Sequence, residues 1–219
     1  LSSFLVQPRR GHMEAIYAIY GYLKHHNRST MVFDDAIINW KDTDFNSYDW
    51  TDFYHEAKEN IPPNAPAPRG NPVQINAFVD ANHARNKVTR RSHTGILIYL
   101  NTAPILWYSK AQTTVETSTF GSEFVAMRIA VDLIEGLRYK LRMFGVPIDG
   151  PANVLSDNMA VIQNSTIPSS TIKKKHNAIC YHRVREAVAS GIIRIAKIDT
   201  TENLADLFTK PLPAVLLHY

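Results

Sequence analysis

Cysteine is almost absent from this sequence: Cys180 is the only one among 219 residues. A single cysteine excludes an intramolecular disulfide and is typical of a reducing, intracellular compartment. It also argues against a zinc site built from thiolates, because such a site needs several cysteines. We therefore expect neither a disulfide framework nor a cysteine-based zinc site.

Long apolar runs are lacking as well. No stretch approaches the about 20 residues of a membrane span, and no signal peptide opens the chain. The first ten residues, LSSFLVQPRR, include no methionine, so we expect the chain to be a piece of a longer polypeptide. Its composition, with 45% hydrophobic and 20% charged residues, is typical of a soluble globular protein with room for one domain and a smaller element.

The net charge of +4 is modest, but the charges are unevenly distributed. Residues 85–91 carry four bases and no acid, and residues 170–194 carry six bases against Glu186 alone. Residues 34–59, by contrast, hold eight acids and two bases. Clustered bases favour a polyanionic partner such as nucleic acid, and a solvated basic face is the alternative.

Proline divides the chain. Residues 11–26, GHMEAIYAIYGYLKHH, place apolar side chains at helical spacing and predict a small N-terminal helix. Five of the twelve prolines then fall between Pro62 and Pro72. Such a run cannot continue a helix or a central strand. We therefore expect a linker at residues 61–72 and the main domain after it.

The pattern after this linker predicts an α/β fold. The expected strands cover residues 73–81, 92–101, 103–111, 152–157 and 192–200, and the expected helices cover residues 118–144, a short stretch after Asp157, and residues 174–189 and 202–210. The long helix has an apolar stripe formed by Phe120, Phe124, Met127, Val131 and Ile134. The first three strands should form an antiparallel meander. We predict a five-stranded mixed sheet, with three antiparallel strands followed by two parallel ones, flanked by helices.

Four acids stand where structure alone does not favour them: Asp80 at the end of the first strand, Glu123 in the first turn of the long helix, Asp157 at the end of the fourth strand, and Asp206 in the final helix. If the first and fourth strands are parallel neighbours, their carboxyl ends meet at the edge where α/β sheets bind ligands. Converging carboxylates repel one another unless a cation joins them. Mg²⁺ prefers oxygen ligands, and two such ions suit phosphodiester hydrolysis.

Each acid also has an ordinary alternative. Asp80 could be a turn residue at a strand end, and Glu123 could interact with the helix dipole. Asp157 could cap the following helix, and Asp206 could be a surface residue of an amphipathic helix. Taken together and in this order of elements, the four acids favour a metal-dependent site.

From about Val73 to Leu212 the chain resembles the ribonuclease H domain of copia-type retrotransposon polyproteins. The motifs that carry the resemblance are FVDAN, RRSHTGILIYLNTAPILWYSKAQ, TSTFGSEFVAM, LSDNMAVI, KKKHNAICYHRVREAVASG and ENLADLFTKPL. The N-terminal LVQPRRGHMEAIYAIYGYLK is similar to the tail of the family's reverse transcriptase, in its thumb-to-connection region. The resemblance thus implies a reverse transcriptase tail at residues 1–60, a linker at 61–72, a ribonuclease H domain at 73–212 and a C-terminal tail at 213–219.

The resemblance further implies a ribonuclease H-like fold that cleaves the RNA strand of RNA–DNA hybrids with two Mg²⁺ ions, for which Mn²⁺ can substitute. Asp80, Glu123, Asp157 and Asp206 would be the catalytic metal ligands, with Ser156 beside them. The rest of the Pol polyprotein, its reverse transcriptase above all, would be the protein partner. The implied location is the cytoplasm, within a virus-like particle, with access to the nucleus.

We expect the nucleic acid to be contacted by a set of basic and polar residues: Arg90, Arg91, Ser92, Thr94, Gln112, Asn158, Lys173, Lys174, Lys175 and His176. The lysines and arginines would lie along the phosphates. Gln112 would read a minor-groove edge or a 2′-hydroxyl, which distinguishes RNA from DNA. Gly95 would allow a close approach of a backbone.

Two features depart from ribonucleases H of cells and retroviruses. Those enzymes usually carry a mobile histidine loop before the last aspartate, whereas this interval reads KIDTTENLAD and contains no histidine. His176 is a candidate substitute, although a hydrogen-bonding role at a helix start is the commoner one. We expect His93 to contact substrate or to be structural.

Three alternatives compete with a nuclease: a degenerate element that binds nucleic acid without cutting, an integrase or transposase, and a structural connection domain within a polymerase. The chain contains no Tyr-x-Asp-Asp motif, so we expect no DNA synthesis from this segment. An integrase or transposase shares the fold class but orders its acids Asp, Asp, Glu, whereas the order here is Asp, Glu, Asp, Asp. A degenerate or connection-type domain that binds nucleic acid without cutting would tolerate loss of the acids, and all four are retained.

Overall fold

The computed structural model describes residues 6–28, 30–173 and 175–210. The chain forms two compact units, Leu1–Phe33 and Asp34–Tyr219. The first unit contains helix α1 (Arg10–His25), and no residue of this helix is buried. The predicted N-terminal helix is therefore present, with Tyr17, Tyr20 and Leu23 exposed.

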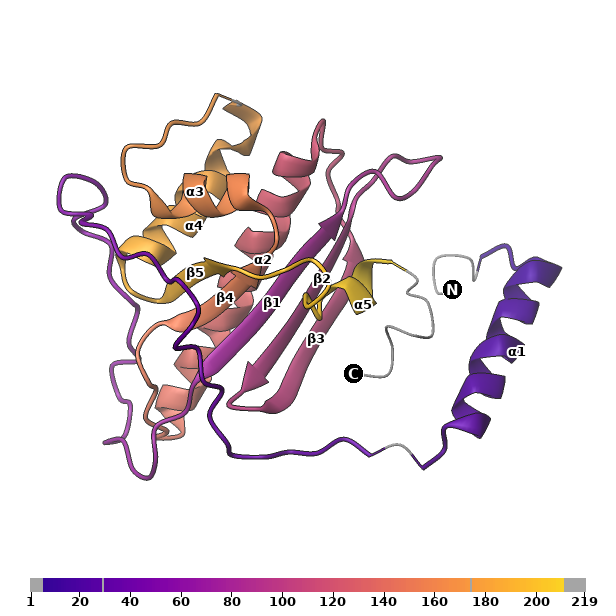
Figure 1. Cartoon of the computed structure of the whole chain (residues 1–219), viewed down its shortest axis with the longest axis horizontal. Coiled ribbons are helices and arrows are strands. Elements are labelled where there is room, and N and C mark those ends of the chain that lie inside the picture. The colour runs from indigo at the N-terminus through magenta and orange to yellow at the C-terminus, as the bar shows by residue number, and fades with distance from the viewer. Residues whose placement is uncertain (1–5, 29, 174, 211–219) are drawn as a thin grey trace. The chain divides into compact units, whose positions relative to one another are not determined.

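The second unit is built on a five-stranded sheet with the order β3-β2-β1-β4-β5. Its strands are β1 (Ile75–Asn82), β2 (His93–Leu100), β3 (Ala103–Ala111), β4 (Ala152–Ser156) and β5 (Ile193–Lys197). Strands β1, β2 and β3 pair antiparallel, whereas β4 pairs parallel with both β1 and β5. This topology confirms the predicted mixed sheet, and it makes β1 and β4 parallel neighbours (Figure 1).

Helices cover the two faces of the sheet unequally. The helices of the second unit are α2 (Thr119–Met143), α3 (Met159–Thr166), α4 (Ala178–Ala189) and the four-residue α5 (Asp206–Thr209), with a 3₁₀ turn, η2 (Lys175–Asn177), before α4. The main core joins α2, α3 and α4 to one face. In α2, the predicted stripe is confirmed, since Phe124, Met127, Val131 and Ile134 are buried and Phe120 packs against them.

The opposite face of the sheet carries a smaller apolar cluster. Phe78, Leu97 and Leu155 are buried there beside Ala205, which precedes α5. Trp40 and Phe45 from the N-terminal part of the unit pack on the same cluster. Helix α5 and this N-terminal segment therefore share one face of the sheet.

Residues 34–60, which we call the strap, are held against the domain by charged and aromatic contacts. The Trp40 indole donates a hydrogen bond of 2.7 Å to the side chain of Asn76 in β1. Glu59 accepts two hydrogen bonds, of 2.7 and 2.9 Å, from Arg138 of α2. These contacts tie the acidic, aromatic-rich stretch of the sequence to the sheet and to α2.

Arginines stack on the aromatic rings of the strap. The guanidinium of Arg185 in α4 lies 4.8 Å from the ring centre of Trp50, and that of Arg194 in β5 lies 4.3 Å from that of Phe45. Such cation–π contacts stabilise a docked segment by about 0.5–2 kcal/mol each. The strap is thus part of the second unit.

The boundary between the units follows Phe33 and differs from the linker expected at 61–72. The proline-rich segment contributes no regular strand, as its composition predicts, but it packs against the end of α2. The Arg69 amide donates a hydrogen bond of 2.9 Å to the carbonyl of Gly145. The assignment of residues 1–60 to a reverse transcriptase tail stays a prediction. The C-terminal tail expected at 213–219, and residues 211–212, lie outside the described residues.

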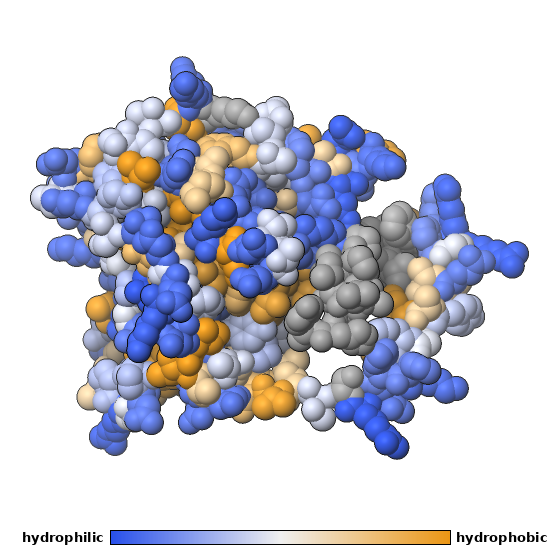
Figure 2. All heavy atoms as spheres, viewed as in Figure 1, coloured by the Kyte–Doolittle hydropathy of each residue, from blue (hydrophilic) through white to orange (hydrophobic). Residues whose placement is uncertain are grey.

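The face of the second unit that is visible in Figure 2 is mainly polar. In the space-filling view, hydrophilic residues cover most of its visible face, with small apolar patches between them (Figure 2). Within the described part of the chain, no helix has both the length and the apolar character that a membrane crossing requires.

Candidate active site

Three of the four predicted acids meet at one edge of the sheet. Asp80, Glu123 and Asp157 each offer a carboxylate oxygen, and these oxygens all lie within 4.8 Å of one another. The meeting follows from the topology, because β1 and β4 are parallel neighbours and α2 begins over their carboxyl ends. The three side chains come from three different elements, and the fold alone brings them together.

Asp80 lies within β1 and does not end it, contrary to the prediction. Its partner in the ladder is Gly95, and the strand continues to Asn82. The hydroxyl of Thr209, at the end of α5, donates a hydrogen bond to the Asp80 carboxylate. The alternative of a turn residue at a strand end is therefore excluded.

Glu123 follows the first turn of α2 and does not lie in it. The helix begins at Thr119 after the cap residue Ser118, whose side chain accepts a hydrogen bond from the Gly121 amide. Glu123 is 7% exposed, and its Oε2 atom is buried with no hydrogen-bond partner among the described residues. A buried carboxylate oxygen without a partner is costly, and a bound cation would relieve that cost.

Asp157 directly follows β4 and is half-buried. It does not cap the next helix, because Asn158 does so: the Asn158 side chain accepts hydrogen bonds from the amides of Ala160 and Val161, at 3.1 and 3.3 Å. The Ser156 hydroxyl, beside the site as expected, accepts a hydrogen bond of 3.3 Å from the Asn158 amide. The carboxylate of Asp157 therefore stays available to the cluster.

Asp206 lies apart from this group of three carboxylates. It is the first residue of α5 and only 7% exposed, so the surface alternative is excluded. Lys210 lies with its Nζ atom 2.8 Å from Oδ2 of Asp206. The other oxygen, Oδ1, is buried and has no hydrogen-bond partner in the described part of the chain.

The carboxylates of the cluster strongly affect one another. Burial raises the pKa of Asp80 to about 6, and the charges of Asp206 and Asp157 act in the same direction, whereas Thr209 and Lys210 oppose the rise. Burial also raises the pKa of Glu123 well above its usual value, and Asp80 and Asp157 add to this rise. The donor set and its orphaned oxygens fit hard divalent cations, which bind carboxylate oxygen and offset this repulsion.

The exposed bases of the predicted nucleic-acid contacts lie in two segments near this edge. Arg90 and Arg91 belong to the loop that follows the Asp80 end of β1. Lys175 and His176 belong to η2, which contacts the start of α2, and Lys173 precedes it. All five side chains are exposed. Lys174 lies outside the described residues.

Three of the polar residues predicted as contacts are buried, which corrects that prediction. Ser92 is fully buried, and its hydroxyl accepts a hydrogen bond of 3.1 Å from the Ala84 amide. The Gln112 amide donates hydrogen bonds to the Thr94 hydroxyl, at 3.0 Å, and to the Ser122 carbonyl, at 2.8 Å. Gln112 thus connects β2 to the start of α2, Ser92 bonds the loop after β1, and all three side chains are buried. A sequence without pairing information does not distinguish such internal partners from surface contacts.

The two histidines considered from the sequence lie outside the carboxylate cluster. His93 bonds the Ser109 hydroxyl through Nε2, at 2.9 Å, in agreement with a structural role. His176 is about half exposed, and its Nε2 atom lies 3.7 Å from Oε2 of Glu116. Glu116 is a buried acid that the sequence pattern did not predict.

The roles of Arg85 and Lys210 around α5 were not predicted from the sequence. Gly95 was expected to allow close approach of a substrate backbone, but it lies against the protein's own chain at α5: a Cβ atom there would lie 2.6 Å from the Ala205 carbonyl oxygen. The Arg85 guanidinium donates a hydrogen bond of 2.7 Å to the Thr209 carbonyl. Asp206 and Lys210 are four residues apart, the spacing of a helical ion pair, and this signal was present in the sequence.

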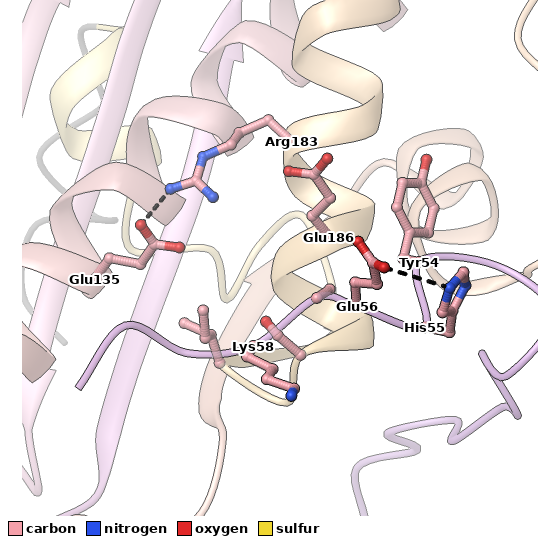
Figure 3. A pocket seen from close by; sticks show the side chains of 10 residues that line it. Tyr54, His55, Glu56, Lys58, Glu135, Arg183 and Glu186 are labelled. Carbon is pink, nitrogen blue, oxygen red and sulfur yellow. Dashed lines mark hydrogen bonds and ion pairs between the residues drawn. The ribbon is translucent and has the colours of Figure 1, made fainter.

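A hollow of about 420 Å³ lies away from the carboxylates, beside the strap. Figure 3 shows its lining, in which Arg183 of α4 is directed at Glu135 of α2 and His55 at Glu56. Its charged groups are thus largely paired with each other. We assign it no ligand.

Comparisons with known proteins point to one group of mobile elements. No protein-family model matches the chain. The chain is 31% identical over 144 residues to the retrovirus-related Pol polyprotein from transposon RE1 of Arabidopsis thaliana, and 30% identical over 139 residues to that from transposon TNT 1-94 of Nicotiana tabacum. These matches cover 66% and 64% of this chain but 10% of each relative.

Solved structures of ribonuclease H are similar at lower identity. LC11-RNase H1 from compost matches with a TM-score of 0.49 and 14% identity, over 62% of this chain and 91% of that one. RNase H1 from Halobacterium salinarum matches with a TM-score of 0.46 and 14% identity, over 62% and 93%. The chain spans about a tenth of the length of the curated relatives it matches. By its sequence it is a relative of the retrovirus-related Pol polyproteins of copia-type transposons, matching one segment of them.

Proposed function

We propose that the domain at residues 73–212 is a ribonuclease H that hydrolyses the RNA strand of RNA–DNA hybrids during reverse transcription. The observation that carries this proposal is the meeting of Asp80, Glu123 and Asp157 within 4.8 Å, from three separate elements. Two of these acids, Asp80 and Glu123, are buried and Asp157 is half-buried, and their mutual repulsion destabilises the ion-free fold. The group is suited to holding divalent cations against a phosphodiester.

The residues that would hold two Mg²⁺ ions, or Mn²⁺ in their place, are these three acids and Asp206. When bound, such ions would supply the positive charge that activates a water molecule and stabilises the leaving oxygen of a phosphodiester displacement. The protein's own part is to orient the ligands. Thr209 holds the Asp80 carboxylate through its hydroxyl, and the packing of α2 keeps Glu123 away from bulk water.

The two exposed basic segments support a nucleic-acid substrate. Arg90 and Arg91 on one side, and Lys173 and Lys175 on the other, would neutralise phosphates along the hybrid. The cations and these bases would then together neutralise the negative charge of the hybrid's phosphate backbone at the site. Binding of the hybrid should weaken steeply with salt, because each neutralised phosphate releases counterions.

The partner expected for this domain is the reverse transcriptase portion of a Pol polyprotein. The relatives carry the matching segment within chains about ten times longer than the match. The exposed apolar residues of α1, including Tyr17 and Leu23, are available for such a contact.

A labelled RNA–DNA hybrid with Mg²⁺ tests this function. The native chain should cut the RNA strand only, and chelator or the Asp157→Asn substitution should reduce the rate by at least about 10³-fold, as for loss of a group that stabilises transition-state charge. Asp149→Asn is the matched control, because Asp149 is exposed in the turn before β4 and should leave the rate unchanged.

Binding without cutting would favour the alternative of a non-cleaving, connection-type domain. The same assay with the reverse transcriptase portion restored separates that alternative from dependence on the polymerase. If the restored protein also binds the hybrid and leaves its RNA intact, the nuclease proposal is wrong.

A further inference from the structure

Lys210 places a positive charge beside Asp206, the fourth candidate ligand. Its ammonium lies 2.8 Å from Oδ2 of Asp206, and its side chain is 37% exposed. Burial alone would lower the pKa of Lys210, but the hydrogen bond to Asp206 and the charges of Asp80, Asp206 and Asp157 raise it. The ammonium is in direct contact with one of the four candidate ligands, Asp206.

The contact between Lys210 and Asp206 is not what fixes α5 in place. The Arg85 guanidinium and the Asn82 amide both donate to the Thr209 carbonyl, at 2.7 and 3.3 Å. The Ser109 hydroxyl donates a hydrogen bond of 2.8 Å to the Phe208 carbonyl. Since these bonds hold the backbone of α5, the Lys210 side chain can move without loss of the helix.

We propose that Lys210 is a built-in cation that pairs with Asp206 while no divalent ion is bound and competes with such an ion for the acidic cluster. This inference rests on the proposed function, because it takes Asp206 and its neighbours as metal ligands. It assigns to Lys210 a positioning role, since Lys210 acts on the ions through Asp206.

The two oxygens of Asp206 show how the competition works. Lys210 occupies Oδ2, while Oδ1 is buried without a hydrogen-bond partner among the described residues. A divalent ion that uses Asp206 must either coordinate Oδ1 beside a positive charge or displace the ammonium. Displacement is feasible because a lysine has a flexible four-carbon stem and the side chain already reaches solvent. The displaced ammonium would gain hydration there.

Cation binding without nucleic acid tests this inference directly. Titration calorimetry with Mn²⁺ and with Mg²⁺ would compare the native chain with Lys210→Met. Because a unit charge about 4 Å from a bound ion interacts strongly even at an intermediate dielectric constant, the variant should bind the ion about tenfold more tightly. Lys210→Arg keeps the charge and should bind within about threefold of the native chain.

Lys140→Met is the matched control for loss of one positive charge. Lys140 is exposed and lies 17 residues beyond Glu123 on α2, about 25 Å away at the rise of an α-helix. This variant should bind the ion as the native chain does. Asp80→Asn should weaken ion binding. This result would show that the measured heat comes from binding at the cluster of Asp80, Glu123 and Asp157.

Thermal unfolding gives a second readout. In chelator, Lys210→Met should unfold at a lower temperature than the native chain, because Asp206 loses its counter-charge. The rise in this temperature on adding saturating Mg²⁺ should then be larger for the variant. A purely structural lysine would lower the unfolding temperature equally with and without the ion.

The outcomes separate the two proposals. Ion binding by the native chain with unchanged affinity in Lys210→Met would overturn the role of Lys210 and leave the nuclease proposal standing. Absence of ion binding by the native chain would overturn both the nuclease proposal and the role of Lys210. Without a bound ion, Lys210 has nothing to compete with. Tighter binding by Lys210→Met, but not by Lys140→Met, is the expected result.

Discussion

Asp80 is a buried side chain whose ionised form is disfavoured by its surroundings. Its carboxylate is 5% exposed and lies beside Glu123 and Asp157, so the ion-free fold favours its protonated form. The hydrogen bond from Thr209 reduces this penalty but does not remove it, since the pKa still rises to about 6. The residue therefore lowers stability near neutral pH and is retained at a site where a cation would use its charge.

The stability of the ion-free protein should fall between about pH 4 and pH 6. The folded state keeps the proton of Asp80 up to about pH 6, whereas the unfolded chain releases it near pH 3.9. The folded state binds more protons in this window, so the contribution of Asp80 to the free energy of unfolding falls as the pH rises through it. The decrease is about 3 kcal/mol for a shift of two pKa units.

Asp80→Asn isolates this contribution. In chelator, urea unfolding should show the variant gaining stability relative to the native chain between pH 4 and pH 7, by up to about 3 kcal/mol. Saturating Mg²⁺ should reverse the order at pH 7, because only the native chain binds the ion fully. Parallel pH curves for the two proteins would contradict the assignment.

At the scale of elements, α5 depends on a glycine in another strand. A Cβ atom on Gly95 would lie 2.6 Å from the Ala205 carbonyl oxygen and 2.6 Å from Cγ2 of Thr209. A backbone atom cannot give way as a flexible side chain would. The short helix that carries Asp206 therefore reaches Asp80 only because β2 has no side chain at this point.

Gly95→Ala should displace α5 and weaken ion binding. We expect a loss of about 1–3 kcal/mol of stability from overpacking, together with at least about a tenfold loss of Mn²⁺ affinity, measured by urea unfolding and calorimetry. Gly136→Ala is the control: a Cβ atom there meets nothing within 4 Å, and alanine in a helix is favoured over glycine by about 1 kcal/mol. Unchanged ion affinity in Gly95→Ala would contradict the dependence on α5.

One acid of the strap, Glu59, pairs with two arginines of α2 and contributes to the attachment of the strap. Glu59 bonds both Arg138, which is 4% exposed, and Arg142. Glu59→Gln leaves the buried Arg138 without a counter-charge and should destabilise the protein by about 3 kcal/mol in urea unfolding. Glu14→Gln breaks the exposed pair with Arg10 and should change stability by less than about 1 kcal/mol. Equal effects of the two substitutions would show that the strap is not anchored here.

At the scale of the whole molecule, the two compact units separate after Phe33, so the strap belongs to the second unit. Deletion of residues 1–33 should leave the unfolding temperature of the second unit unchanged, because the unit boundary follows Phe33. Deletion of residues 1–60 should lower it, since Trp40, Trp50 and Glu59 are then lost. Thermal unfolding of the two truncated chains measures this. An equal unfolding temperature for both would place the boundary at the linker that the sequence predicts.

Local patterns predicted most of the fold. The alternation in residues 73–81 and the stripe from Phe120 to Ile134 arise from neighbours in sequence, so they predicted β1 and α2 to within two residues. The strap was missed for the opposite reason. Its residues bond partners 36 and 79 positions away, such as Trp40 with Asn76 and Glu59 with Arg138, and no local period records such pairs.

The sequence by itself determined the order of the elements, the apolar faces and the identity of the four acids, because residue type and spacing are local properties. Only the tertiary structure decided which acids meet. It placed β4 beside β1 and brought Asp80, Glu123 and Asp157 within 4.8 Å, but it paired Asp206 with Lys210. Distances between residues far apart in the chain depend on how all the elements pack at once, and that packing decides which charges share a site.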